Sequence, residues 1–150
     1  MTEKTVLLVE DDPADARLIQ RAFDRTAGQA AVLRLQNGDD AVAYLQGTPP
    51  FDNRVAHPLP HIVVLDIKLP RRSGLEVLQW IRTRTDDLRL LPVVMLTSSR
   101  HAVDINRAYL LGANSYLAKP ETSVELLSLV STLKTYWLLM NENPAIPGTA

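Results

Sequence analysis

The chain has 150 residues, of which 46% are hydrophobic, 22% charged and 5% aromatic, as is usual for one ordinary soluble domain. Its formal net charge of -1 gives no electrostatic reason to expect a nucleic acid or an anionic membrane as the main partner. The absence of cysteine excludes zinc fingers, thiol catalysis, iron–sulfur clusters and disulfide scaffolds. No apolar run approaches the ~18 residues of a membrane span, and the opening residues do not resemble a secretory signal, so we expect a cytoplasmic protein.

Five short apolar runs alternate along the chain with longer amphipathic segments. The runs are Val6–Val9, Val32–Leu35, Ile62–Leu65, Val93–Leu96 and Tyr116–Ala118. Short runs rich in Val, Leu and Ile are typical of strands that are covered on both faces of a parallel sheet. With right-handed crossovers, this alternation predicts an α/β domain of three layers, with helices on both faces of the sheet.

Four predicted helices begin at residues whose side chains can accept hydrogen bonds from free backbone N–H groups. These residues are Asp12 before Pro13, Asp39, and the first members of the capping boxes Ser73 with Glu76 and Thr122 with Glu125. A further helix from about His101 is expected to end at Gly112, which fits a left-handed C-cap. The segment from Gly47 to Pro60 holds four of the ten prolines and is expected to be a loop. We expect one domain over residues 1–143 and a flexible tail over residues 144–150.

The last predicted helix carries one broad apolar stripe that the sheet can bury. The stripe consists of Leu126, Leu129, Val130, Leu133, Tyr136, Trp137 and Met140. Val124, Leu127 and Leu138 fall outside it, and Lys134 is the only charged residue between Leu126 and Met140. An exposed apolar patch of this kind usually marks a partner surface. The alternative is burial against the tail of the chain or the neighbouring helix.

Polar side chains follow four of the five predicted strands. In chain order they are Glu10, Asp11 and Asp12 after the first strand, Asp66 after the third, Thr97 and Ser98 after the fourth, and Lys119 after the fifth. In a parallel sheet all of these groups lie at the carboxyl edge, where open α/β sheets bind their ligands. The sequence therefore predicts a functional site at this edge.

The chemistry of this predicted site follows from its charges. Two carboxylates repel each other by about 4 kcal/mol at ~4 Å with an effective dielectric near 20, so a crowded set needs a cation. With no cysteine and no spaced pair of histidines, the available ligands are oxygens, which favour Mg²⁺. The Thr97 hydroxyl and the Lys119 ammonium can then support a phosphoryl group. The set predicts a site that holds a phosphoryl group on or near a carboxylate.

Four of the predicted strands run into a short motif of chemically active residues. In chain order, the motifs are Val-Glu-Asp-Asp (9–12), Leu-Asp-Ile-Lys-Leu-Pro (65–70) with Gly74, Leu-Thr-Ser (96–98) and Ala-Lys-Pro (118–120). Together they resemble the motifs of the receiver domains of two-component response regulators, over about residues 5–135. The resemblance implies a CheY-like, flavodoxin-like fold, a doubly wound parallel sheet of five strands in the order 2-1-3-4-5. It also implies a switch that catalyses only its own phosphorylation and dephosphorylation, and is not a metabolic enzyme.

The resemblance assigns a role to each matching residue. Asp66 corresponds to the phosphoryl acceptor, Thr97 to the switch hydroxyl and Lys119 to the phosphate-binding lysine. Tyr116 corresponds to an aromatic residue whose orientation is coupled to phosphorylation, and Asp12 is left outside the metal site as a helix cap. The expected ligands of Mg²⁺ are Glu10, Asp11, Asp66 and the backbone carbonyl of Lys68.

These roles predict a stand-alone receiver that is phosphorylated on Asp66 by a sensor histidine kinase and signals by contact with an unknown downstream protein. The opening Glu-Asp-Asp-Pro-Ala-Asp-Ala-Arg (10–17), the proline-rich loop and Tyr136-Trp137-Leu138 are similar to single-domain receivers that pair with phytochrome-type kinases. This narrower similarity implies a red-light sensor, a bacteriophytochrome, as the kinase and a homodimer through the C-terminal helix region. One alternative is a constitutive scaffold that does not cycle phosphate. Another is a phosphatase or phosphotransferase of a different α/β family with an aspartyl nucleophile. Lys68 argues against it, because one such large family has a second aspartate at this position.

Overall fold

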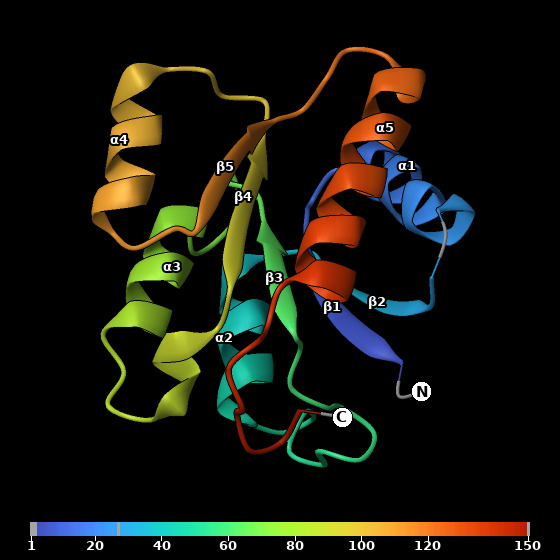
Figure 1. Cartoon of the computed structure of the whole chain (residues 1–150). Coiled ribbons are helices and arrows are strands. Elements are labelled where there is room, and N and C mark those ends of the chain that lie inside the picture. Colours follow the sequence, from blue (N-terminus) through green and yellow to red (C-terminus); the bar gives the residue numbers. More distant parts are fainter. Residues whose placement is uncertain (1–2, 27, 150) are drawn as a thin grey trace.

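The computed structural model describes residues 3–26 and 28–149, which form an open sheet between two layers of helices (Figure 1). The sheet has five parallel strands in the order β2-β1-β3-β4-β5. The strands are β1 (Lys4–Val9), β2 (Ala30–Leu35), β3 (Ile62–Leu65), β4 (Val93–Thr97) and β5 (Ser115–Ala118). The predicted doubly wound fold and all five predicted strands are therefore confirmed.

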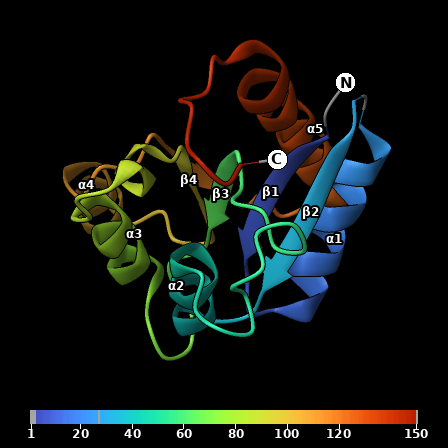
Figure 2. The ribbon, with the colours of Figure 1, turned by 90° about the horizontal axis from the view of Figure 1, so that it is seen from below.

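Five α-helices and two shorter helical segments alternate with the strands or follow the last of them in the described residues. They are α1 (Pro13–Arg25), α2 (Gly38–Gln46), α3 (Gly74–Arg82), the 3₁₀ turn η1 (Asp87–Leu90), α4 (Ala102–Leu110), α5 (Ser123–Lys134) and the π-helical segment η2 (Thr135–Met140). Helices α1 and α5 cover one face of the sheet, and α2, α3 and α4 cover the other (Figures 1 and 2). Within the part of the chain that the structure describes, no helix combines the length and apolar character needed to cross a membrane.

The two faces of the sheet divide the hydrophobic core into two clusters. Alternate residues of a strand point to opposite faces, so Val6 and Leu8 of β1 pack towards α1 and α5. Leu7 and Val9 pack towards α2 and α3. Burial on both faces explains why β1 reads as a continuous apolar run.

Most of the predicted helix ends have the expected hydrogen bonds. The side chains of Asp12, Ser73 and Thr122 accept hydrogen bonds from backbone N–H groups at the starts of α1, α3 and α5. The capping box is complete at Ser73, because Glu76 in turn accepts from the Ser73 N–H. Gly112, with a φ of 104°, follows the last turn of α4 in the left-handed conformation.

The predicted N-cap at Asp39 is wrong. Helix α2 starts earlier, and the side chain of Asn37 accepts a hydrogen bond from the Asp40 N–H at 2.8 Å. Asn and Asp are about equally good N-caps, so the backbone path decides between them. Gly38 allows this early start, because a Cβ at that position would lie 1.9 Å from the carbonyl oxygen of Arg72.

The last helix is not regular throughout, and part of the predicted apolar stripe is wrong for this reason. Over Thr135–Met140 the backbone is π-helical, and its wider turns rotate the side chains relative to an α-helix. Leu138 is therefore buried, with 4% exposure, although the stripe excluded it. Tyr136 and Met140, predicted to face the sheet, are 50% and 67% exposed. The predicted stripe is correct as far as Leu133, which is buried.

The segment after Asn143 returns to the domain and packs at the amino-terminal end of the sheet (Figure 1). Ile146 is buried in the core cluster that includes α2 and α3. The backbone N–H of Leu59 donates to the carbonyl of Gly148 at 2.8 Å. This packing differs from the expected flexible tail, because Ile146 supplies an apolar anchor and Leu59 a backbone partner; residue 150 lies outside the described residues.

Candidate functional site

The carboxyl ends of four strands bring the predicted site residues together. Glu10 and Asp11 follow β1, Asp66 follows β3, Thr97 ends β4 and Lys119 follows β5. One carboxylate oxygen from each of Glu10, Asp11 and Asp66 lies within 4.8 Å of the other two. The parallel order of the strands explains this convergence, because β1 and β3 are neighbours and end at the same edge.

Lys119 lies among the carboxylates of the site. Its Nζ is 3.0 Å from Asp66 Oδ2 and 2.9 Å from Asp15 Oδ2, and it forms an ion pair with Glu10. Burial disfavours the ammonium charge, but the interactions with these three carboxylates outweigh burial and raise the pKa of Lys119 above its ordinary value. Lys119 therefore stays charged and offsets part of the negative charge of the site.

Glu10 is the most buried carboxylate of the cluster, with 1% of the residue exposed. Burial is the main cause that raises the pKa of Glu10 above its ordinary value, and the nearby charge of Asp66 raises it further. The hydrogen bond from Lys119 acts in the opposite direction. A second cation close to Glu10 would therefore stabilise the ionised carboxylate.

The oxygen atoms of this site fit a divalent cation. Carboxylates are hard ligands, and three of them converge here from two strand ends. Asp11 is exposed, which leaves that side of the cluster open to water ligands. Lys68 lies beside Asp66 at the rim of a cavity of about 390 Å³ that also reaches Thr97.

Asp66 is held in one orientation by hydrogen bonds to both carboxylate oxygens. Its Oδ1 accepts from the Ile67 N–H at 2.7 Å, and its Oδ2 accepts from Lys119. The loop after β3 is tied to the start of α3, because the Gly74 N–H donates to the carbonyl of Ile67 at 2.8 Å. The Asp66 carboxylate is therefore buried but lines the cavity of about 390 Å³, from which a phosphodonor could approach it. The loop that carries it is held by a backbone hydrogen bond to α3.

Thr97 and Tyr116 are linked through the loop that follows β4. Thr97 is buried, and its Oγ1 lies 3.4 Å from the N–H of Ser99. The hydroxyl of Tyr116 donates to the carbonyl of Ser99 at 2.9 Å, and burial raises the pKa of Tyr116. The Ser99 hydroxyl in turn donates to Asp104 of α4 at 2.5 Å. A movement of this loop would therefore reach both β5 and α4.

Two residues of the site were missed by the sequence analysis. Asp15 lies in the first turn of the helix that directly follows Glu10 and Asp11, so its position near the carboxyl edge could have been read from the sequence. Arg34 of β2 donates from Nε to the carbonyl of Glu10 at 3.1 Å and from Nη2 to that of Asp11 at 3.2 Å. No local pattern marks Arg34, because it lies 24 residues from Glu10 in sequence.

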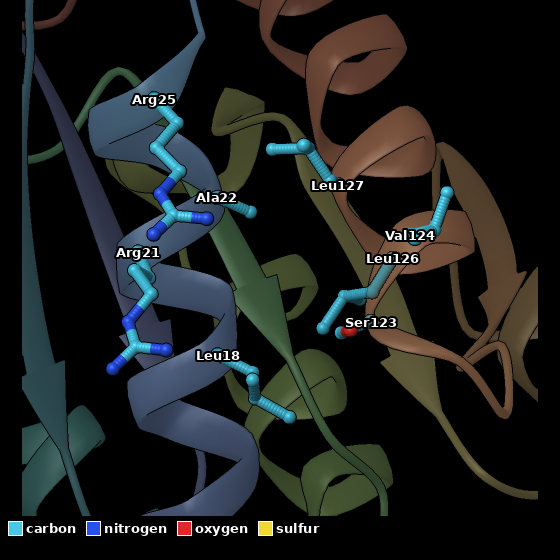
Figure 3. A pocket seen from close by; sticks show the side chains of 8 residues that line it. All are labelled: Leu18, Arg21, Ala22, Arg25, Ser123, Val124, Leu126 and Leu127. Carbon is cyan, nitrogen blue, oxygen red and sulfur yellow. The ribbon is translucent and has the colours of Figure 1, made fainter.

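A cavity of about 180 Å³ lies on the surface between the packed helices α1 and α5 (Figure 3). Arg21 and Arg25 lie along the α1 side of this cavity, and Leu126 and Leu127 extend from α5 on the other side. A second cavity, of about 90 Å³, shares Leu18 and Leu126 with the first and is also lined by Asp15 and Lys119. The α1–α5 surface is therefore continuous with the charged site.

Residues 6–131 match the family of response regulator receiver domains, which covers most of the chain. The chain belongs to this family. The order of the strands and the residues at the carboxyl edge of the sheet agree with that membership. The resemblance of the sequence motifs to receiver domains is thereby confirmed.

This receiver domain is similar over nearly its whole length to two relatives, from an archaeon and a cyanobacterium. The probable methanogenesis regulatory protein FilR2 of Methanothrix harundinacea is 41% identical over 139 residues, covering 93% of this chain and 86% of the relative. The response regulator Rcp1 of Synechocystis is 36% identical over 135 residues, covering 90% and 89%.

Two solved structures share the fold of this receiver domain closely. The phosphorylated cyanobacterial phytochrome response regulator RcpA has a TM-score of 0.89 at 33% identity, covering 96% of this chain and all of that chain (100%). The Mn²⁺-bound form of Rcp1 has a TM-score of 0.86 at 34% identity, covering 95% and 99%.

Proposed function

We propose that this receiver accepts a phosphoryl group on Asp66 from the phosphohistidine of a sensor histidine kinase. The observation that carries the proposal is the position of Lys119 Nζ, 3.0 Å from Asp66 Oδ2 within a cluster of carboxylates. The proposed cation is Mg²⁺, held by Glu10, Asp11, Asp66 and the backbone carbonyl of Lys68. The phosphorylated form of RcpA and the Mn²⁺-bound form of Rcp1 support both parts of the proposal by similarity.

In the proposed transfer, a carboxylate oxygen of Asp66 attacks phosphorus and forms a new O–P bond. The N–P bond to the kinase histidine breaks, and its electron pair returns to the imidazole. Lys119 donates a hydrogen bond to a phosphoryl oxygen, and the Thr97 hydroxyl donates another. Mg²⁺, when bound, supplies the positive charge that allows the phosphoryl group to approach the carboxylates.

Phosphorylation replaces one carboxylate charge with a dianionic acyl phosphate, and this change drives the proposed switch. Thr97 moves towards the phosphoryl group and draws the following loop with it. Tyr116 responds because its hydroxyl bonds to Ser99 in that loop. The signal then passes to the surfaces of α4, β5 and the last helix, where a downstream protein binds.

The first test is intact-mass spectrometry after incubation with Mg²⁺ and acetyl phosphate. The wild-type chain is expected to gain one phosphoryl group, and Asp66→Asn is expected to gain none, because an amide oxygen cannot form the acyl phosphate. Removal of Mg²⁺ with a chelator should also abolish the gain. A folded wild-type chain that gains nothing would instead support the constitutive scaffold, and a phosphorylated Asp66→Asn variant would place the acceptor elsewhere.

We also propose that the kinase is of the phytochrome type and that the receiver forms a homodimer through the C-terminal helix region. RcpA is a phytochrome response regulator, which supports this kinase by similarity. Leu139 is 60% exposed and Met140 67% exposed. A groove of about 550 Å³ lies between β5 and the last helix, and Leu129, Trp137 and the half-exposed Tyr136 line it. Exposed apolar side chains next to a groove favour association of two copies.

The proposed dimer predicts a selective effect of a charge in this region. Leu139→Glu is expected to weaken self-association by about tenfold or more, because the interface would have to bury an unpaired carboxylate. Val55, which is 94% exposed on the loop before β3, provides the control variant Val55→Glu with the same added charge. Light scattering over a range of concentrations measures the effect. Equal self-association of the two variants would show that the interface does not include the last helix.

A further inference from the structure

Asp15 is a carboxylate of the site that has neither the acceptor role nor a place in the proposed metal set. It lies in the first turn of α1, and its Oδ2 is 2.9 Å from Lys119 Nζ. Its side chain is 36% exposed, whereas the Lys119 side chain is 10% exposed. Asp15 therefore contacts the lysine from the solvent side of the site.

The three carboxylates around Lys119 have different fates in the proposed phosphorylation cycle. Asp66 becomes the acyl phosphate, and Glu10 is committed to the cation. Asp15 alone of the three is left free to keep its contact with the ammonium. We infer that Asp15 is a positioning residue that holds the Lys119 ammonium in place for the phosphoryl group. This inference rests on the proposed function.

The backbone around Asp15 is firmly fixed, as a positioning residue requires. The Asp12 side chain caps α1 and accepts hydrogen bonds from the N–H groups of Ala14 at 2.8 Å and Asp15 at 3.4 Å. Ala16, the next residue, and Ile19, one turn further on, are each 1% exposed and pack the helix against the sheet. Lys119 has a long side chain with many rotamers, so a fixed acceptor on a rigid helix reduces the entropy lost when the ammonium is positioned.

Replacement of Asp15 should affect the rate of phosphoryl transfer and the binding of the phosphodonor in different ways. Loss of the anchor should slow transfer once the phosphodonor is bound, because Lys119 is less often aligned. Loss of the negative charge should not weaken binding of the anionic donor, since a carboxylate beside the entry to the site repels it. Asp15 variants should therefore lower the maximal rate and leave the half-saturating donor concentration unchanged or lower.

The experiment measures phosphorylation rates of the full chain against acetyl phosphate concentration at saturating Mg²⁺. Asp15→Ala is expected to lower the maximal rate about tenfold. Asp15→Asn keeps a hydrogen-bond acceptor and is expected to stay within about threefold of wild type. The control is Asp24→Ala, which removes an exposed carboxylate from the other end of α1 and should behave as wild type. A folded Asp15→Ala variant with the wild-type maximal rate overturns the inference, as does a loss confined to donor binding.

A second measurement tests the anchor independently of phosphorylation. Labelling of lysines with an acylating reagent, followed by peptide mass spectrometry, reports how freely the Lys119 amine reacts. Lys119 should react about threefold faster in Asp15→Ala, the effect of losing one ion pair, and exposed Lys68 serves as the internal reference. Unchanged labelling contradicts the anchor. If the wild-type chain is not phosphorylated at all, the proposed function fails, and the labelling result still decides whether Asp15 holds Lys119.

Discussion

Replacement of Gly74 by alanine is expected to lower the free energy of unfolding by about 3 kcal/mol and to slow phosphorylation of Asp66 more than ~10-fold. A Cβ at this position would lie 1.8 Å from the carbonyl oxygen of Asp66 and 2.9 Å from the Cα of Ile67. Both atoms belong to the backbone, so the loop after β3 has to move to relieve the clash. Because Asp66 is on that loop, the variant disturbs the acceptor together with the fold.

Replacement of glycine by alanine in a helix usually raises the free energy of unfolding, the opposite of the effect expected here. Alanine favours a helix over glycine by about 1 kcal/mol, so without the clash Gly74→Ala would stabilise α3. Gln79→Ala, at an exposed position of the same helix, is the matched control and should leave both stability and phosphorylation close to wild type. Urea unfolding and the acetyl phosphate reaction measure the two effects. A Gly74→Ala protein as stable and as reactive as wild type would show that the close contact has no importance.

Lys134→Met is expected to lower the free energy of unfolding by about 3 kcal/mol, because it leaves buried carbonyl groups without their hydrogen-bond donor. The ammonium of Lys134 is buried and donates to the carbonyls of Phe23 at 2.7 Å, Thr26 at 3.1 Å and Gly28 at 2.7 Å. These carbonyls lie at and beyond the end of α1, where the helix itself supplies no donors. Methionine retains the aliphatic length but provides no donor, so the carbonyls lose their partner.

Thermal unfolding measures this effect, with a decrease in Tm of about 10 °C expected for a domain of this size. The control is Lys68→Met, which removes an exposed ammonium and should leave Tm nearly unchanged. Phosphorylation of the folded Lys134→Met protein should remain, since Lys134 is at the far end of α5 from Lys119. An unchanged Tm would mean that water or another donor replaces the ammonium at no cost.

Lys134 is buried by contacts that local sequence patterns do not indicate. Lys134 is the only charged residue between Leu126 and Met140, a feature that would usually place it in water, yet it is 2% exposed. Its partners lie more than a hundred residues away, between 106 and 111 positions earlier in the chain. A burial of this kind depends on the packing of α5 against α1 and leaves no local pattern.

The exposure of Tyr136, Leu138 and Met140 could not be predicted from the sequence for a different reason. The helical stripe assumes a constant period, and the period changes at the π-helical segment. No glycine or proline marks the change within Thr135–Met140. The exposed apolar surface used for the proposed dimer thus consists partly of side chains that a regular helix would have placed elsewhere.

The sequence by itself determined the five strands, their parallel arrangement and the edge at which Glu10, Asp11, Asp66, Thr97 and Lys119 gather. These features follow from local patterns, because short apolar runs and the polar residues that end them are read from neighbouring positions. Only the tertiary structure decided that Asp15 contacts Lys119 and that Arg34 supports the backbone of the acidic pair. Both contacts join elements far apart in the chain, so they arise from the way α1, β2 and β5 are packed together.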